Sequence, residues 1–102
     1  MGKRLRDRVM SSADIYFYND WVLYSGVAAN VSENGMFIVT ENNNLFPESQ
    51  IEVFIPVGEK VIYVPAKLIR IYISNDFYDG IGIELLYRPD DYSRYVKSLR
   101  NN

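Results

Sequence analysis

The chain contains no cysteine and no histidine. These absences exclude disulfides, thiol nucleophiles, zinc sites built from Cys or His, and acid/base catalysis by an imidazole. No convergent pair of acidic residues points to catalysis by carboxylates instead. The composition therefore predicts a protein that is not an enzyme and that needs no metal and no cofactor.

Long hydrophobic runs are also missing. No stretch approaches the roughly 20 apolar residues that a membrane-spanning helix requires, and the basic N-terminus lacks the apolar core of a signal peptide. We therefore expect a cytoplasmic protein without membrane insertion. With 102 residues, the chain is long enough for one hydrophobic core and too short for two.

Positive charge is concentrated at one end of the chain. The net charge is −2, yet four of the eleven basic residues, Lys3, Arg4, Arg6 and Arg8, lie in the first eight positions. A basic arm therefore precedes an acidic body. This asymmetry argues against a DNA or RNA partner, which requires a broad basic face, and favours one local site for a small anion.

Short apolar segments separated by turn-forming residues dominate the rest of the chain. Alternation and turn signals predict strands at residues 13–18, 21–31, 36–40, 49–56, 61–73 and 80–87. Pro65 lies within the fifth segment and predicts an edge position or a bulge there. Six strands at this spacing predict a small antiparallel barrel or sandwich.

Two of these strands show a clear buried face. The residues expected to share an inner face are Ile51, Val53 and Ile55 in the fourth strand and Ile81, Ile83, Leu85 and Tyr87 in the last. A C-terminal helix should follow, with an apolar stripe formed by Tyr92, Tyr95, Val96 and Leu99. Pro89 suits the first turn of that helix.

Nine tyrosines raise the alternative of a barrel that stacks nucleic-acid bases. Most of the aromatic rings, however, lie in the apolar strand and helix patterns and are expected to pack in or around the core. Tyr16, Tyr18 and Trp21 fit neither pattern. We interpret these three as candidates for exposed contacts with a partner.

One short motif carries most of the functional information. Alternation along the second strand places Asn30 and Ser32 on the same face at its end, and Gly35 then allows a tight turn. Taken alone, such residues are ordinary turn chemistry, and a basic N-terminus is an ordinary solvated tail. Together with Arg4 and Arg8, which are four positions apart, they indicate an anion site.

An Arg-x-x-x-Arg pair followed by Asn-x-Ser-x-x-Gly resembles the two-part signature of PilZ domains, the bacterial receptors for cyclic di-GMP. The segments 64–70 and 80–85 also resemble strands of that family. The resemblance implies an all-β fold, a six-stranded antiparallel β-barrel with a C-terminal α-helix. Residues 1–12 would form a flexible basic arm and residues 13–100 the single barrel domain.

The resemblance also implies a role for each signature residue. Arg4 and Arg8 would clamp the phosphates and guanine edges of cyclic di-GMP, because the guanidinium fork matches both acceptors. Asn30 would orient a guanine, Ser32 would hydrogen-bond a phosphate or base edge, and Gly35 would let the backbone approach.

Three further positions follow from the same comparison. Lys3 and Arg6 are given auxiliary roles, Lys3 because its position in the family influences whether one ligand molecule or a stacked pair is bound. Many family members have Gly where this chain has Asn34, and we expect Asn34 to tolerate a left-handed backbone there.

The predicted function is that of a cyclic di-GMP receptor or adaptor. Ligand binding would change the conformation of the arm and thereby regulate a separate partner protein or self-association as a homodimer. The alternative is a PilZ-like module that binds proteins without any nucleotide. The two arginines favour the receptor.

Overall fold

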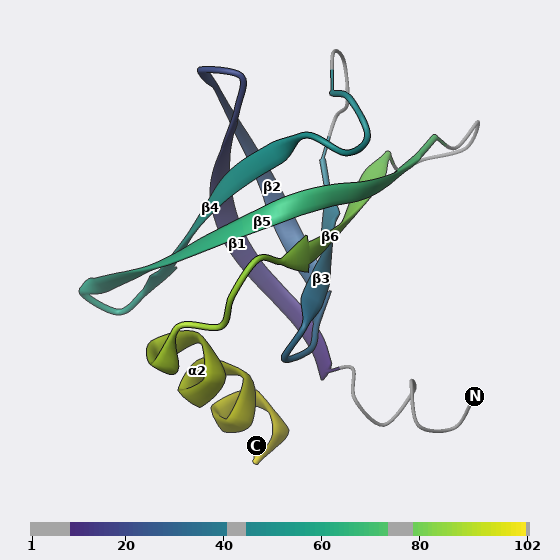
Figure 1. The fold of residues 1–102 in the computed structure, drawn as a ribbon. Coiled ribbons are helices and arrows are strands. Elements are labelled where there is room, and N and C mark those ends of the chain that lie inside the picture. The colour runs from purple at the N-terminus through teal and green to yellow at the C-terminus, as the bar shows by residue number, and fades with distance from the viewer. Residues whose placement is uncertain (1–8, 41–44, 74–78, 102) are drawn as a thin grey trace.

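The computed structural model describes residues 9–40, 45–73 and 79–101. They form an antiparallel β-barrel followed by one helix (Figure 1). The elements are β1 (Val9–Asn19), β2 (Val22–Val31), β3 (Gly35–Val39), β4 (Gln50–Val57), β5 (Lys60–Tyr72), β6 (Gly80–Leu85) and α2 (Asp90–Arg100).

The strands close into a barrel in the order β1-β2-β3-β6-β5-β4, and every neighbouring pair is antiparallel. The predicted six-stranded barrel with a C-terminal helix is therefore confirmed. Closure removes the exposed sheet edges that an open sheet of this size would leave.

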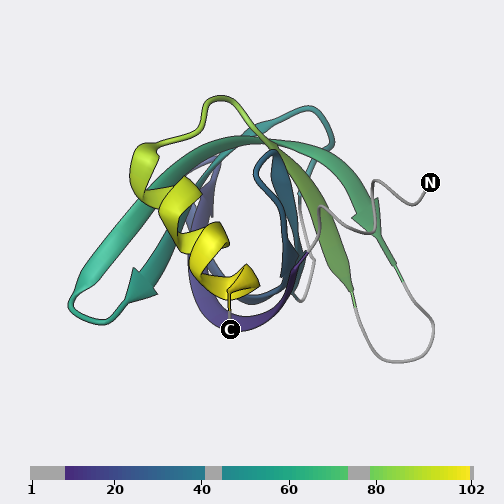
Figure 2. The same cartoon turned by 90° about the horizontal axis from the view of Figure 1, so that it is seen from below.

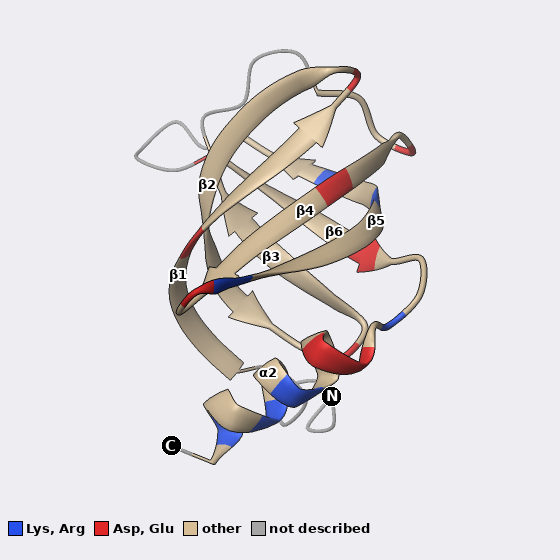
Figure 3. Cartoon of the chain, turned by 90° about the vertical axis from the view of Figure 1, so that its left-hand side faces the viewer, with Lys and Arg blue, Asp and Glu red and all other residues tan. Residues whose placement is uncertain are grey.

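The helix α2 lies across one end of the barrel (Figure 2). It begins after Pro89, as predicted, with acidic residues in its first turn and basic residues in its last turn (Figure 3). Its buried residues are Tyr92 and Val96. The β1–β2 hairpin lies at the opposite end of the barrel from α2 (Figures 1 and 3).

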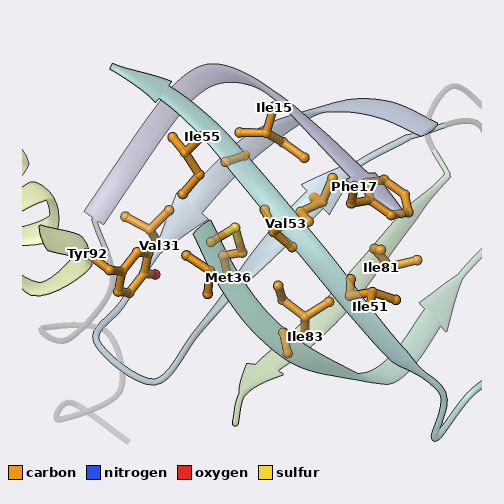
Figure 4. Packing of buried hydrophobic residues seen from close by; sticks show 14 of the residues in the cluster. Ile15, Phe17, Val31, Met36, Ile51, Val53, Ile55, Ile81, Ile83 and Tyr92 are labelled. Atoms are coloured by element: carbon orange, nitrogen blue, oxygen red, sulfur yellow. The ribbon is translucent and has the colours of Figure 1, made fainter. Parts of the chain in front are cut away.

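The barrel interior is filled by aliphatic side chains with one large ring, that of Phe17 (Figure 4). The predicted inner face of β4 is confirmed, since Ile51, Val53 and Ile55 are all completely buried. Tyr92 projects from α2 into the end of this core. A single continuous core therefore joins the helix to the barrel.

The inner face predicted for the last strand is only partly correct. Ile81 and Ile83 are buried, whereas Tyr87 is exposed. The reason is that β6 ends at Leu85, so Tyr87 lies outside the strand alternation. No helix among the described residues is long and apolar enough to cross a membrane.

The first hairpin also differs from its prediction at both ends. Strand β1 begins at Val9, earlier than the expected residue 13. Trp21 was expected to open the second strand, but Asp20 and Trp21 form the turn, with φ values of 54° and 68°. Both residues are thus in the left-handed region that usually favours Gly or Asn.

Strand β5 lies between β4 and β6 in the closed barrel, and its register irregularity falls between Leu68 and Arg70. The edge position or bulge predicted at Pro65 is therefore wrong. The carbonyl of Pro65 accepts a hydrogen bond from the N–H of Leu86, the first residue after β6. The side of Pro65 that faces β6 therefore lies just beyond the end of that strand, where a residue without an N–H is tolerated.

Candidate functional site

The motif Asn30 to Gly35, which we call the signature turn, connects β2 to β3. The N–H of Ser32 donates to the carbonyl of Gly35 at 2.8 Å. The Ser32 hydroxyl oxygen accepts from the N–H of Asn34 at 3.3 Å and donates to the Gly35 carbonyl at 3.4 Å. Ser32 therefore shapes the turn with its own side chain, as serine often does in turns.

Asn30 and Ser32 lie on either side of Val31, which is completely buried. Both are half-buried, so alternation places their side chains outside the core at the end of β2. An irregularity in the β2–β3 register falls between Ala28 and Asn30. This shift keeps Ala28 and Val31 both in the core although they are three positions apart.

Gly35 is required for a different reason from the predicted one. Its φ is not in the left-handed region, so the turn does not depend on the conformational freedom of glycine. A Cβ at this position would lie 2.3 Å from the backbone carbonyl oxygen of Ile83 on β6. Only glycine allows the two backbones to approach this closely.

Asn34 likewise does not adopt the left-handed backbone that we expected. The non-glycine residues with positive φ among the described positions are Asp20, Trp21 and Glu48. Asn34 instead accepts a hydrogen bond from the N–H of Leu85 through its carbonyl, at 2.9 Å. The signature turn is thus attached to the end of β6.

The helix supplies a second attachment that the sequence did not reveal. The hydroxyl of Tyr92 donates to the carbonyl of Ser32 at 2.7 Å and lies 3.3 Å from the carbonyl of Gly35. Burial raises the pKa of Tyr92 well above its ordinary range, with smaller contributions from Tyr95 and the charge of Glu33. In the sequence, the one sign of this contact was the position of Tyr92 on the buried stripe of the helix, because a buried hydroxyl needs a hydrogen-bond partner.

The acidic residue of the signature turn is paired with arginines from the C-terminal part of the chain. Arg88 lies 2.8 Å from one carboxylate oxygen of Glu33, and Arg100 lies 3.8 Å from the other. This carboxylate would otherwise repel an anionic ligand at the turn. The two guanidinium groups offset its charge.

The basic arm lies outside the described residues, including Lys3, Arg4, Arg6 and Arg8. Its point of attachment is described. Val9, which follows Arg8 in the sequence, pairs with Val31, and Met10 pairs with Asn30. The chain therefore enters the barrel beside the signature turn, at the end that α2 covers.

The described part of the site offers neutral hydrogen-bonding groups: the Asn30 amide, the Ser32 hydroxyl and the backbone of the turn. No group of three or more acidic residues able to hold a metal ion occurs within residues 9–40, 45–73 and 79–101. These groups suit the recognition of a polar ligand by hydrogen bonds, and they leave positive charge to be supplied by other parts of the chain.

Solved structures with the same fold come from several bacteria. The PilZ domain of YcgR from Escherichia coli, in a structure with c-di-GMP, is 16% identical with a TM-score of 0.69; the match covers 92% of this chain and 88% of that one. The PilZ domain of CeSA from a cellulose-synthesizing bacterium is 15% identical with a TM-score of 0.68, and the match covers 90% of this chain and 92% of that one. The inhibitor of motility MotI/DgrA from Bacillus subtilis is 15% identical with a TM-score of 0.78.

The match to MotI/DgrA covers 92% of this chain but 48% of that protein, so this chain spans about half its length. No curated protein sequence matches the chain. The family model of the PilZ domain, by contrast, matches residues 2–99. That match takes in the arginine pair, the signature turn and the helix, and the chain therefore belongs to the PilZ domain family.

Proposed function

We propose that this domain is a receptor for cyclic di-GMP, which it binds between the basic arm and the signature turn. The observation that carries the proposal is the register of β1 against β2. Because Val9 pairs with Val31 and Met10 with Asn30, the backbone that bears Arg8 joins the barrel next to the residues expected to read the guanine. Two of the structures with this fold hold c-di-GMP, the YcgR domain and Borreliella burgdorferi PlzA.

The ligand chemistry fits the division of groups between arm and turn. Cyclic di-GMP carries two phosphate charges and two guanines. Arg4 and Arg8 supply charge and planar forks for the phosphates and for guanine O6 and N7. Asn30 and Ser32 supply neutral hydrogen bonds, and Gly35 keeps the turn close to β6 so that the ligand can approach the backbone. Lys3 and Arg6 assist with charge alone.

The response to the ligand is a change in the conformation of the arm. Met1 to Arg8 carries four basic residues and one acidic residue, and a bound dianion neutralises the repulsion among them. Such a change alters the surface at the end of the barrel. We propose that this surface regulates a separate partner protein or the association of two copies of the domain.

The helix couples the proposed site to other parts of the molecular surface. Any displacement of the signature turn acts directly on Tyr92, through the hydrogen bond to Ser32, and on the Glu33 ion pairs with Arg88 and Arg100. A ligand that moves the turn therefore also acts on α2. This coupling supports a receptor or adaptor, and we propose no catalytic role for the chain.

The competing function is a protein-interaction module of the same family without nucleotide binding. The two functions make different predictions for an NMR titration of the ¹⁵N-labelled chain. Cyclic di-GMP should shift the amides of residues 30–35 and of Tyr92, while that of Gly58 in the distant β4–β5 turn should stay in place. Cyclic di-AMP is the matched control, because it has the same ring and charge but lacks guanine O6. Shifts with neither dinucleotide would favour the interaction module, and equal shifts with both would contradict specific recognition of guanine.

A further inference from the structure

A row of aromatic side chains crosses the outer surface of three adjacent strands. Tyr16 on β1 is opposite Phe54 on β4, and Phe54 is opposite Tyr63 on β5. Tyr18 completes the group, with its ring edge-on to that of Phe54 at 6.0 Å; the Phe54 and Tyr63 rings are 5.3 Å apart. We call these four residues the aromatic face.

The barrel core does not account for this surface. The residues that alternate with it, Phe17, Val53 and Val64, point inward and are completely buried. Tyr16, Tyr18 and Tyr63 remain 47%, 42% and 40% exposed. Contiguous exposed aromatic area of this kind is uncommon on a monomeric protein unless something binds it.

Aliphatic neighbours extend the aromatic face in two directions. Leu23 on β2 is opposite Tyr18 and is 54% exposed; Val61 on β5 is opposite Pro56 and is 58% exposed. The apolar surface therefore continues from β2 across β1 and β4 to β5. An interface core typically has this composition, with rings at its centre and aliphatic groups around them.

Acidic side chains are interleaved with the rings. Asp14 precedes Tyr16 by two positions on β1, and Glu52 precedes Phe54 by two positions on β4, so each carboxylate projects from the same outer face as its ring. Acidic segments on β1 and β4 are visible in Figure 3. Within the described ranges, neither carboxylate forms an ion pair.

The two lysines of β5 do not change this balance. Lys67 on β5 is already bound to Glu48 at 2.8 Å. Lys60 directly follows Glu59 in the sequence, so the charges of these two residues sum to zero. Desolvation raises the pKa of the Tyr63 hydroxyl, and the negative charge of Glu52 raises it further. Glu52 therefore acts on the aromatic face directly. The net local charge is negative.

We propose that the aromatic face is a docking surface for a basic segment of a partner protein. Arginine side chains of such a segment stack on Tyr16, Phe54 and Tyr63 and pair with Glu52 and Asp14. Arginine fits best because its planar guanidinium combines ring stacking with a fork that matches a carboxylate. A second copy in a face-to-face arrangement fits poorly, since it would bring two negatively charged faces together.

The docking surface is separate from the nucleotide site. Both lie along β1. Met10, opposite Asn30, marks the nucleotide site, whereas Tyr16 of the docking surface lies toward the β1–β2 hairpin. At about 3.3 Å per residue, the two positions are about 20 Å apart along the strand. Docking therefore does not require that the proposed nucleotide binding be correct, and the two proposals can fail independently.

The experiment is an NMR titration of the ¹⁵N-labelled chain with a capped synthetic peptide that repeats Arg-Ser-Leu three times. The control peptide repeats Glu-Ser-Leu. The arginine peptide should shift the amides of Tyr16, Phe54 and Tyr63 in a saturable manner and leave residues 30–35 unaffected; the glutamate peptide should shift none of them. Absence of shifts at millimolar arginine peptide, or equal shifts with both peptides, would overturn the proposal.

Two variants test the residues themselves. Glu52→Gln should weaken peptide binding by about two- to fivefold, whereas Glu84→Gln, which removes a carboxylate from the outer side of β6, should leave it unchanged. Tyr16→Gln should abolish saturation with an unchanged melting temperature. Equal affinities of the two Glu variants would overturn the proposal. So would a concentration-dependent dimer in sedimentation that disappears in Tyr16→Gln, because it would identify a second copy as the occupant.

Discussion

The hydroxyl of Tyr92 donates a 2.7 Å hydrogen bond to the backbone carbonyl of Ser32, a residue 60 positions earlier in the chain. The bond is made by a completely buried ring. It joins the helix to the turn that carries the nucleotide-binding signature. The position of α2 and the geometry of the proposed site are consequently parts of one arrangement.

Removing this hydroxyl should destabilise the fold. Tyr92→Phe leaves the carbonyl of Ser32 without its buried donor, which typically costs about 1–3 kcal/mol. Tyr95→Phe is the matched control, because that ring is also on the helix stripe but its hydroxyl donates to no described residue. Urea unfolding of the two variants measures the difference. Equal free energies of unfolding would show that the bond adds nothing.

The same tyrosine predicts a loss of stability in alkali. Its folded-state pKa is raised above the ordinary value of 10.0, so above pH 10 the unfolded chain releases this proton while the folded chain still holds it. The free energy of unfolding must then fall as pH rises. Unfolding curves from pH 8 to 11 should show the advantage of the wild type over Tyr92→Phe shrinking above pH 10. An advantage that stays constant across this range would contradict the assignment.

Gly35 should not tolerate even a methyl group. In Gly35→Ala the new Cβ would meet the Ile83 carbonyl oxygen at 2.3 Å, and forced repacking of this kind costs about 1–3 kcal/mol. Gly82→Ala on β6 is the control, because its nearest neighbour, a ring carbon of Tyr72, would lie at an ordinary 3.6 Å. Thermal unfolding should show a clearly lower midpoint for the first variant alone. If both variants have the same melting temperature, the close approach of β3 and β6 is wrong.

The neutral residues of the proposed nucleotide site should contribute less to the affinity for cyclic di-GMP than its arginines do. Asn30→Ala and Ser32→Ala each remove neutral hydrogen bonds, so each should weaken cyclic di-GMP binding by about two- to tenfold. Calorimetric titration of cyclic di-GMP into these two variants and into Arg8→Ala measures the three affinities. A greater loss from either neutral substitution than from the arginine change would mean that the signature turn, and not the arm, dominates affinity.

The barrel could be predicted from the sequence because most of its strands alternate over a buried face. The inner face of β4 and the helix start at Pro89 follow from local periodicity alone. The early start of β1 could not be predicted, since Met10, Ser11 and Ser12 show no apolar alternation. The turn after β1 was predicted one residue too early, between strands 13–18 and 21–31. Asp20 tolerates its left-handed backbone, but the positive φ of Trp21 could not be predicted, because bulky residues rarely adopt it.

The site was predictable only in part, because its geometry depends on contacts between distant segments. Asn30 and Ser32 follow from strand alternation. The need for Gly35 arises from the backbone of Ile83 on another strand, and Tyr92 and Arg88 reach the turn from the C-terminal segment. No local pattern encodes such contacts, although the signature residues themselves were visible.

The most direct test of the receptor proposal is calorimetric titration of cyclic di-GMP into the wild-type chain and into the double variant Arg4→Ala/Arg8→Ala. Charged hydrogen bonds contribute about 1.5–3 kcal/mol each, so each single change should weaken binding by about ten- to a hundredfold and the double change should abolish measurable heat. Circular dichroism should show an intact barrel in all variants. An affinity that is unchanged in the folded double variant, or no binding by the wild type, would contradict the account.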